Sequence, residues 1–363
     1  METASGSVHE LLVNRSSIAV SELREATVSS LGPGQIRLLV EKFALTANNV
    51  TYAQFGDMLD YWNFFPVDSE WGKVPAMGWA RVTESNVDGI APADRFYGWF
   101  PMATSVDVTA TPTSTGFRDD GPHRSKQAAA YRNFTRSDLD GLYTTPEDED
   151  RHALLRGLYV TGFLIEAFLS AQHYLGAEQS LVLSASSKTA LSYAHCARSS
   201  GGMRLVGLTS VSNRDFVAAL GAYDEVLTYD QLDQVAMVPS VLIDMSGAGA
   251  VVAALHSRLG DQIAHSMVVG KSHHDAPARP VPAGPQPEMF FAPTAMGDRL
   301  LEWGPGEYQQ RIVRGLTSFL HDSREWLKVE HSRGPAAVQE AWKSLVGGVV
   351  APSSGIIATM HSS

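Results

Sequence analysis

Residues 179–210 show the pattern of a strand, a tight turn, a helix and a second strand. The apolar run 181–183 is short enough for a buried parallel strand, and small or apolar residues then recur at helical spacing over 190–197. A second apolar run, 204–208, follows the helix. This order predicts a βαβ unit of the kind that binds nucleotides, and it constrains the fold more than any other segment.

The turn before this helix consists of small hydroxyl residues and one lysine. We expect a diphosphate to lie on the free amides of the helix start. The glycines of the usual G-x-G-x-x-G are missing, so small side chains must permit the tight turn while hydroxyls and the lysine add phosphate partners. The alternative is a serine-rich N-cap before an ordinary helix. The predicted phosphate-binding residues are Ser184, Ser186, Ser187, Lys188 and Thr189.

The second strand ends in hydroxyl residues followed by an arginine. At this position a carboxylate binds the ribose hydroxyls of NAD and repels a 2′-phosphate, whereas an arginine accommodates that phosphate. No carboxylate occurs before Asp215, so the segment favours NADP. The alternative places Arg214 as a solvated residue of the next helix. The predicted ribose-phosphate site comprises Thr209, Ser210, Asn213 and Arg214.

Strands and helices continue to alternate as far as residue 270. This rhythm predicts a doubly wound parallel sheet over residues 151–325, with its ligand across the carboxyl ends of the strands. Cofactor contacts are predicted near these ends at Tyr229, Ser246, Gly247, Val269, Gly270 and Lys271.

The N-terminal half has the short strands and irregular turns of a distorted barrel. Segments 36–43 and 74–83 suit strands, and a helix at 335–345 with a strand at 355–359 completes the same domain. We therefore expect a substrate domain over 1–150 that 326–363 completes.

Residues 110–149 are polar and rich in turn formers. They predict an excursion from the barrel, either a lid or an interdomain wrap. His123 and Arg124 are candidates for binding an anionic substrate group, and the alternative is that they pair with nearby acids.

The order of segments resembles the medium-chain dehydrogenase/reductase superfamily, in its zinc-free quinone oxidoreductase and enoyl reductase branch. Residues 93–98 resemble the barrel turn G-D-R-V-x-G with alanine at the first glycine, and 220–229 resemble L-G-A-D-x-V-I-D-Y. More narrowly, 43–52 together with 184–190 resemble the DUF2855 subgroup. The resemblance implies an α/β fold with a Rossmann domain and a GroES-like distorted β-barrel domain, and a homodimer.

The same resemblance suggests which residues carry the chemistry. Segment 45–52 resembles a strand-to-loop segment that places an Asn and a Tyr near the nicotinamide, and Thr161 matches a helix residue that touches it. A phenol can donate a proton or a hydrogen bond to a carbonyl as hydride arrives. Tyr52 is the candidate proton donor and Asn49 its positioning partner, with Asn48 as the alternative. The rival tyrosines are Tyr97, Tyr131 and Tyr159.

Charge and hydropathy exclude several classes of partner. The net charge of −11 and the absence of a basic tract argue against nucleic acid. The apolar stretches are interrupted short of the about 20 residues that span a bilayer. The N-terminus has no basic-then-apolar signal, so we expect a cytoplasmic protein without a membrane partner.

The metal-binding chemistry of the superfamily is not expected here. Structural zinc sites need several cysteines, and Cys196 is the single thiol. Segment 273–275 (His-His-Asp) is the sole cluster with ligand chemistry, but adjacent side chains on a strand point apart. Without zinc, hydride transfer needs another electrophile.

These observations favour an NADP-dependent, zinc-independent oxidoreductase that moves hydride between nicotinamide and an activated alkene, quinone or carbonyl. Its substrate is expected to be a small molecule. Fold does not fix function, so two alternatives stay open: a nonredox lyase or carbon–carbon bond hydrolase, and a catalytically inactive NADP-binding regulatory protein.

Overall fold

The computed structural model describes residues 7–143, 145–201, 203–269 and 281–362. The chain forms two compact units: unit 1 comprises 1–154 and 327–363, and unit 2 comprises 155–326. The first division lies within helix α3 (Glu149–Ala171), and the second follows the last residue of α7 (Ala292–Trp326). The boundaries predicted after residues 150 and 325 lie within these two helices.

Unit 1 is built around a closed antiparallel barrel. Strand β3 pairs with β5 on one side and with β7 on the other, which closes the ring. Two register shifts in the β3–β5 pairing bend the strand so that it can serve both neighbours. The ring contains β3 (Gln35–Leu45), β5 (Pro75–Ser85), β6 (Arg95–Pro101), β9 (Asn133–Arg136), β8 (Gly116–Asp119) and β7 (Ser105–Thr113).

The barrel interior follows from alternation along these strands. Ile36, Leu38 and Val40 are fully buried at every second position of β3, as expected for a strand with one face in the core. Their cluster continues with Phe96, Phe117 and other apolar residues of the ring. The prediction of a GroES-like barrel beside a Rossmann domain is confirmed.

Additional elements of unit 1 extend the barrel. The parallel pair β16 (Lys328–Arg333) and β17 (Ser354–Thr359) joins β3, so the C-terminal residues complete the N-terminal unit. The amphipathic helix α8 (Pro335–Val346) buries Trp342 in the same core. A separate sheet contains β1 (Ser7–Asn14), β2 (Ser21–Thr27) and β4 (Trp71–Gly72), and the short helices are α1 (Ala47–Gln54), η1 (Tyr61–Phe64), η2 (Pro122–Arg124), α2 (Ala129–Arg132) and η3 (Pro146–Asp148).

The prediction that 110–149 leaves the barrel is wrong for its central part. Strands β8 and β9 lie in this segment, and they connect β7 to β6 within the ring. Phe117 and Phe134 stack with ring centroids 4.5 Å apart and fill the core from these strands. Gly116 lies directly against the backbone of the neighbouring strand, where a side chain would collide with the Phe134 carbonyl.

Unit 2 contains a parallel sheet with the strand order expected of a Rossmann domain. From the central strand β10, the chain proceeds one way through β11 and β12 and then the other way through β13, β14 and β15. The strands are β10 (Gln179–Leu183), β11 (Arg204–Thr209), β12 (Glu225–Thr228), β13 (Ser240–Asp244), β14 (Ile263–Val269) and β15 (Glu288–Phe290).

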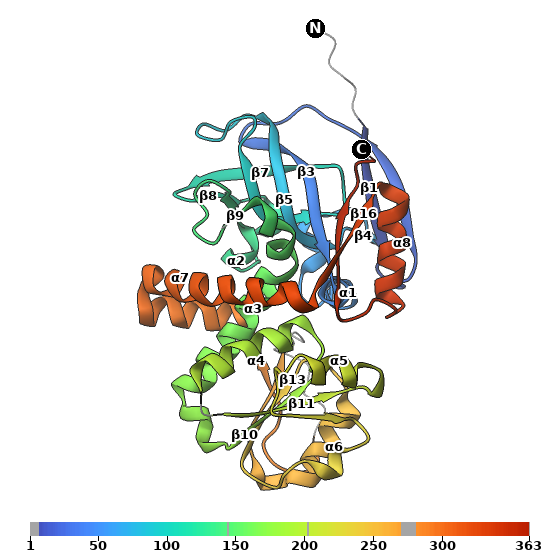
Figure 1. The fold of residues 1–363 in the computed structure, drawn as a ribbon. Coiled ribbons are helices and arrows are strands. Elements are labelled where there is room, and N and C mark those ends of the chain that lie inside the picture. The colour runs from blue at the N-terminus through green and yellow to red at the C-terminus, as the bar shows by residue number, and fades with distance from the viewer. Residues whose placement is uncertain (1–6, 144, 202, 270–280, 363) are drawn as a thin grey trace. The chain divides into compact units, whose positions relative to one another are not determined.

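Helices cover both faces of this sheet. Figure 1 shows α4 (Lys188–Ser200) and α5 (Arg214–Ala219) on one side of the strands and α6 (Gly249–Leu259) on the other. Helix α7 is broken at Gly304, which has a φ of 74° and is followed by Pro305. Single-turn helices fill the connections: η4 (His173–Gly176), η5 (Val211–Asn213), η6 (Leu232–Gln234) and η7 (Gly260–Gln262).

One helical segment is apolar enough to be compared with a membrane span, contrary to the expectation from the sequence. Residues Pro146–Ala171 have a best 18-residue window with a mean hydropathy of 1.4, and 61% of that window is buried. Such burial is typical of a core helix.

Helices α3 and α4 approach closely at Gly162. A Cβ atom there would lie 2.3 Å from the Ser192 Oγ and 2.5 Å from the Tyr193 backbone nitrogen. We therefore expect Gly162→Ala to lower the free energy of unfolding by about 1–3 kcal/mol, because the two helices must separate. Gly297→Ala in α7 is the matched control, since no atom lies within 4 Å of its added methyl group.

For the control we expect a neutral or slightly stabilising effect, because alanine favours helix more than glycine does. Urea unfolding followed by circular dichroism measures both variants. Equal stability of Gly162→Ala and the native protein would contradict the close contact.

Candidate functional site

The polar residues singled out in unit 2 gather at one edge of the parallel sheet. Because all of its pairings are parallel, the carboxyl ends of the strands lie along that edge. Ser184 follows β10, Ser210 follows β11, Tyr229 follows β12 and Ser246 lies just beyond β13. Half-buried Val269 is the last residue of β14. The structure thus brings the predicted segments together.

The turn after β10 adopts a glycine-like conformation without glycine. Ser184 has a φ of 57°, in the left-handed region that glycine normally occupies. Its amide donates a hydrogen bond to the Tyr229 hydroxyl at 3.0 Å, so a side chain from the end of β12 supports the strained residue. Tyr229 is therefore a structural partner of the turn as well as a neighbour of the site.

Ala185, the next residue of the turn, is fixed by contacts with Tyr223 and Gly207. Ala185 is fully buried, and its carbonyl accepts a hydrogen bond from the Tyr223 hydroxyl at 3.0 Å. Gly207 of β11 provides the space, because a Cβ there would lie 2.8 Å from the Tyr223 ring and 3.0 Å from the Ala185 methyl group. Small residues in the turn and on β11 thus allow the backbone of the turn to pack tightly.

The turn leads directly into the N-terminus of α4. Ser187 is the N-cap, and its side-chain oxygen accepts a hydrogen bond from the Ala190 amide at 3.2 Å. Thr189 is buried. Half-buried Lys188 is the first helical residue, and burial lowers the pKa of its amine to about 8. A cation at the N-terminus of a helix is well placed to meet a diphosphate.

The segment after β11 provides exposed hydroxyl groups and a cation. The Ser210 and Ser212 hydroxyls lie 2.9 Å apart, and the Asn213 amide donates to the Ser186 hydroxyl at 3.1 Å, which ties this segment to the phosphate turn. The Arg214 side chain is 49% exposed and pairs only loosely with Asp215, at 3.6 Å. Thr209 differs from the rest because only 1% of it is exposed.

The end of β13 contains a residue that the sequence analysis did not select. Asp244 is buried, and its Oδ1 accepts hydrogen bonds from the Ser246 amide, the Ser246 hydroxyl and the Gly247 amide at 2.7–2.9 Å. Gly247 then turns with a φ of 68°. An aspartate at the last position of a strand before Ser and Gly is the sequence signal for this turn.

The remaining predicted cofactor residues are Gly270, Lys271 and Thr161. Gly270 and Lys271 lie outside the residues that the structure describes, as does the His273–Asp275 cluster. Thr161 is half-buried on α3, and its hydroxyl donates to the Gly157 carbonyl at 3.1 Å. Within the described ranges, no group of three or more His, Cys, Asp or Glu side chains is placed to hold a metal ion.

In unit 1, the Asn and Tyr candidates lie on a helix and not on the expected loop. Thr46 caps α1, and the Asn49 Oδ1 accepts a hydrogen bond from the Thr46 amide at 2.7 Å. Asn49 is buried and its amide donates to the Pro75 carbonyl at 3.0 Å, so its polar atoms bind the local backbone. Asn48 lies one turn before Tyr52 on α1, and the influence of its side chain on the Tyr52 phenol lowers the pKa of that phenol.

Tyr52 belongs to an aromatic cluster. Its ring centroid lies 4.6 Å from that of Tyr61 and 5.4 Å from that of Trp99. Tyr131, named as a rival proton donor, packs against Tyr61 in the same cluster, whereas Tyr97 contacts Trp79 and Tyr159 contacts Phe319 in unit 2. Burial raises the pKa of Tyr52, although the Asn48 side chain opposes that shift, so the phenol is protonated at neutral pH.

Arg124 packs against Phe64, an aromatic residue next to this cluster. Its side chain is fully buried, lies 3.3 Å from Asp119 and covers the Phe64 ring with 4.1 Å between guanidinium carbon and ring centroid. The pairing with a nearby acid, the alternative stated for His123 and Arg124, is the arrangement observed for Arg124. Partial desolvation of its imidazole lowers the pKa of His123, although the residue is exposed.

Comparison with protein families gives one match, to the family described as protein of unknown function DUF2855, over residues 43–351. The chain belongs to this family. The resemblance seen in segments 43–52 and 184–190 is therefore confirmed. Comparison with curated proteins gives no match.

Solved structures share the fold at low sequence identity. CurA from Vibrio vulnificus in complex with NADPH is 11% identical with a TM-score of 0.60, and the alignment covers 98% of this chain and 100% of CurA. The complex of Etr1p with NADP and crotonyl-CoA is 12% identical with a TM-score of 0.55, at 98% and 100% coverage. A putative NADPH:quinone reductase from Bacillus thuringiensis is 13% identical with a TM-score of 0.54, at 98% and 99% coverage.

Proposed function

We propose that the protein is an NADP-dependent, zinc-independent oxidoreductase that acts on an activated alkene, quinone or carbonyl. The observation that carries the proposal is the carboxyl edge of the unit 2 sheet. There a left-handed Ser184 turn leads into the N-terminus of helix α4 at Lys188, and the neighbouring strand ends in hydroxyl residues and Arg214. The proteins of shared fold described with NADPH or NADP support the choice of cofactor.

The residues at this edge fit the parts of the dinucleotide. The α4 amides, the Ser186 and Ser187 hydroxyls and Lys188 would hold the diphosphate. Ser210 and Arg214 would hold the ribose 2′-phosphate. The segment 209–214 after β11 contains no carboxylate that would repel this phosphate. The buried Thr209 would shape this pocket rather than bind the phosphate through an exposed hydroxyl.

When bound, the cofactor supplies a hydride to the electrophilic carbon of the acceptor. The Tyr52 phenol, which Asn48 would position, would donate a hydrogen bond or its proton to the acceptor oxygen as negative charge develops there. Solvent would return that proton. The aromatic neighbours of Tyr52 limit access of water to the phenol and favour a planar conjugated substrate.

Cofactor oxidation separates this function from the alternatives. We expect the full-length protein to oxidise NADPH when it is mixed with members of a panel of enones, quinones and aldehydes, as measured by absorbance at the nicotinamide band. A nonredox enzyme or a regulatory protein would bind NADPH in calorimetry and oxidise none with any acceptor.

The role of Lys188 predicts a pH-dependent affinity. In the free protein its pKa is about 8 because burial disfavours the charged amine. A bound diphosphate favours that charge and raises the pKa, so binding takes up a proton above pH 8. We expect the affinity for NADPH to be nearly constant below pH 8 and to fall by up to about tenfold per pH unit above it.

Lys188→Gln is the matched control. This variant should bind NADPH and NADH more weakly by a similar factor, since both carry the diphosphate, and its affinity should lose the fall above pH 8. Titration calorimetry from pH 7 to pH 10 measures both effects. A Gln variant with native affinity and native pH dependence would show that Lys188 does not contact the diphosphate.

A further inference from the structure

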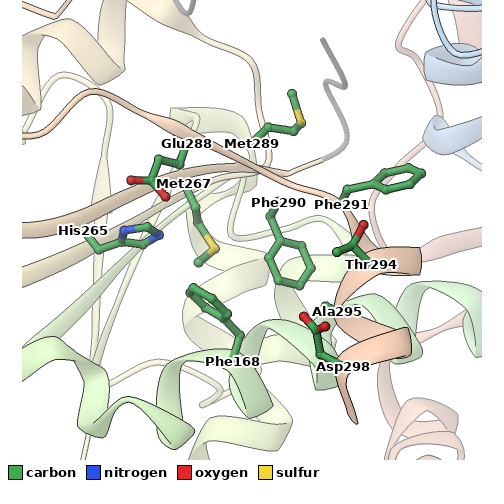
Figure 2. Close-up of a pocket in the computed structure, with 10 residues that line it drawn as sticks. All are labelled: Phe168, His265, Met267, Glu288, Met289, Phe290, Phe291, Thr294, Ala295 and Asp298. Atoms are coloured by element: carbon green, nitrogen blue, oxygen red, sulfur yellow. The ribbon is translucent and has the colours of Figure 1, made fainter. Parts of the chain in front are cut away.

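A second cavity lies within unit 2, formed by β14, β15, the C-terminal half of α3 and the N-terminal part of α7. Its volume is about 210 Å³. Figure 2 shows the side chains of Phe168, Met267 and Phe290 converging in its interior. None of the described residues assigned to the dinucleotide lines this cavity, so it is distinct from the phosphate and ribose sites proposed above.

The interior of the cavity is aromatic and sulfur-rich. The Phe168 and Phe290 rings meet edge to face at a centroid distance of 6.1 Å, and Met267 is 1% exposed. Rings in this arrangement present both edges and faces to a bound group. An apolar cavity of about 150 Å³ accommodates one benzene molecule, so this one has room for a single ring with a short arm.

The charged residues at the cavity are all of one sign. Glu288 and Asp298 line it and are exposed to solvent, and no lysine or arginine occurs among its described lining residues. No described residue forms an ion pair with either carboxylate. His265 also lines the cavity but adds no positive charge at pH 7, because burial lowers the pKa of its imidazole.

We propose that this cavity binds a small arylalkyl ammonium ion, with its ring against Phe168 and Phe290 and its ammonium group at one of the two carboxylates, Glu288 or Asp298, that Figure 2 shows at opposite ends of the cavity. The aromatic faces attract a cation as well as a ring, and the carboxylates supply the opposite charge at the solvent side. The inference is independent of the proposed NADP-dependent reaction.

Three probes of similar size and different charge test the proposal on the full-length protein: 2-phenylethylammonium, neutral 2-phenylethanol and anionic 3-phenylpropanoate. In calorimetry at low salt we expect the ammonium probe to bind at least about tenfold more tightly than the alcohol, and the carboxylate to show no binding. Added salt should weaken the ammonium probe, because its carboxylate partners are exposed.

Substitutions identify the residues. We expect Asp298→Asn or Glu288→Gln, whichever removes the carboxylate that the ammonium group contacts, to weaken the ammonium probe severalfold, and Phe290→Leu to weaken both it and the alcohol. Asp261→Asn removes an exposed carboxylate that does not line the cavity and should leave the affinity unchanged. NADPH affinity should be unaffected when the ammonium probe is saturating.

Four outcomes would overturn the proposal. Equal affinity for the ammonium and the alcohol would show that charge is not recognised, and native affinity in both carboxylate variants would place the probe elsewhere. Competition with NADPH would place it in the dinucleotide site. Absence of probe binding, together with a dimer in sedimentation analysis, would indicate that a second copy of the chain covers the cavity.

Discussion

Replacing Tyr52 by Phe is expected to lower turnover with NADPH and its best acceptor by about 10²–10⁴, the usual contribution of a positioned acid, with little change in NADPH affinity. The ring stays in place against Tyr61 and Trp99, so the aromatic cluster keeps its packing. Only the hydroxyl is lost. Steady-state kinetics and NADPH titration of the same preparation measure the two quantities.

Tyr61→Phe provides the matched control. The Tyr61 ring centroid lies 4.6 Å from that of Tyr52, and Tyr61 is buried in the same cluster, so this variant also loses one phenol hydroxyl from it. We expect its turnover to remain close to the native value. A Tyr52→Phe protein with native turnover, or an equal loss in the two variants, would assign the proton to solvent or to another group.

Unit 2 was the more predictable half because its signals are local. A buried parallel strand is a continuous apolar run, and a helix repeats its apolar residues every three or four positions, so β10, α4 and β11 can be read directly from 179–209. The absence of glycine did not mislead, because a serine can occupy the left-handed position when another group supports it. That support, the Tyr229 hydroxyl, comes from a distant strand and has no local signal.

Unit 1 depends on contacts between residues far apart in sequence. Strands β8 and β9 have four residues each, too few to show alternation, and they are strands because closing the barrel pairs them with β7 and β6. A polar, turn-rich sequence such as 110–149 therefore reads as a loop. Pairing partners and not local propensity decide its structure.

The two adjacent asparagines illustrate the same limit within the candidate site. Both precede Tyr52 on α1, and sequence alone cannot show which one faces it. The capping box places Asn49 against the Thr46 amide and the Pro75 carbonyl, which commits its oxygen and its nitrogen. Spacing of four residues then brings Asn48 to the phenol. Asn48 is accordingly the positioning residue that we propose in place of Asn49.

Replacing Arg214 by Ala is expected to weaken NADPH binding by about 10- to 100-fold and to leave NADH binding nearly unchanged, because only NADPH loses a charge-assisted contact of about 1.5–3 kcal/mol. In the free protein this arginine has only a loose pair with Asp215, at 3.6 Å between exposed groups. Such a pair contributes little to stability, so the guanidinium can turn to a phosphate at small cost.

Arg198→Ala is the control that separates this contact from a general change in charge. Its side chain is also 49% exposed and pairs with an exposed acid, Asp224, at 3.2 Å, but it lies in the last turn of α4, away from the phosphate turn. We expect native affinity for both cofactors in this variant. In Arg214→Ala the loss of NADPH affinity should shrink as salt rises, because the native contact is partly exposed and screened. An equal loss of NADPH and NADH would contradict the 2′-phosphate contact, since a contact to the shared part of the cofactor cannot distinguish the two.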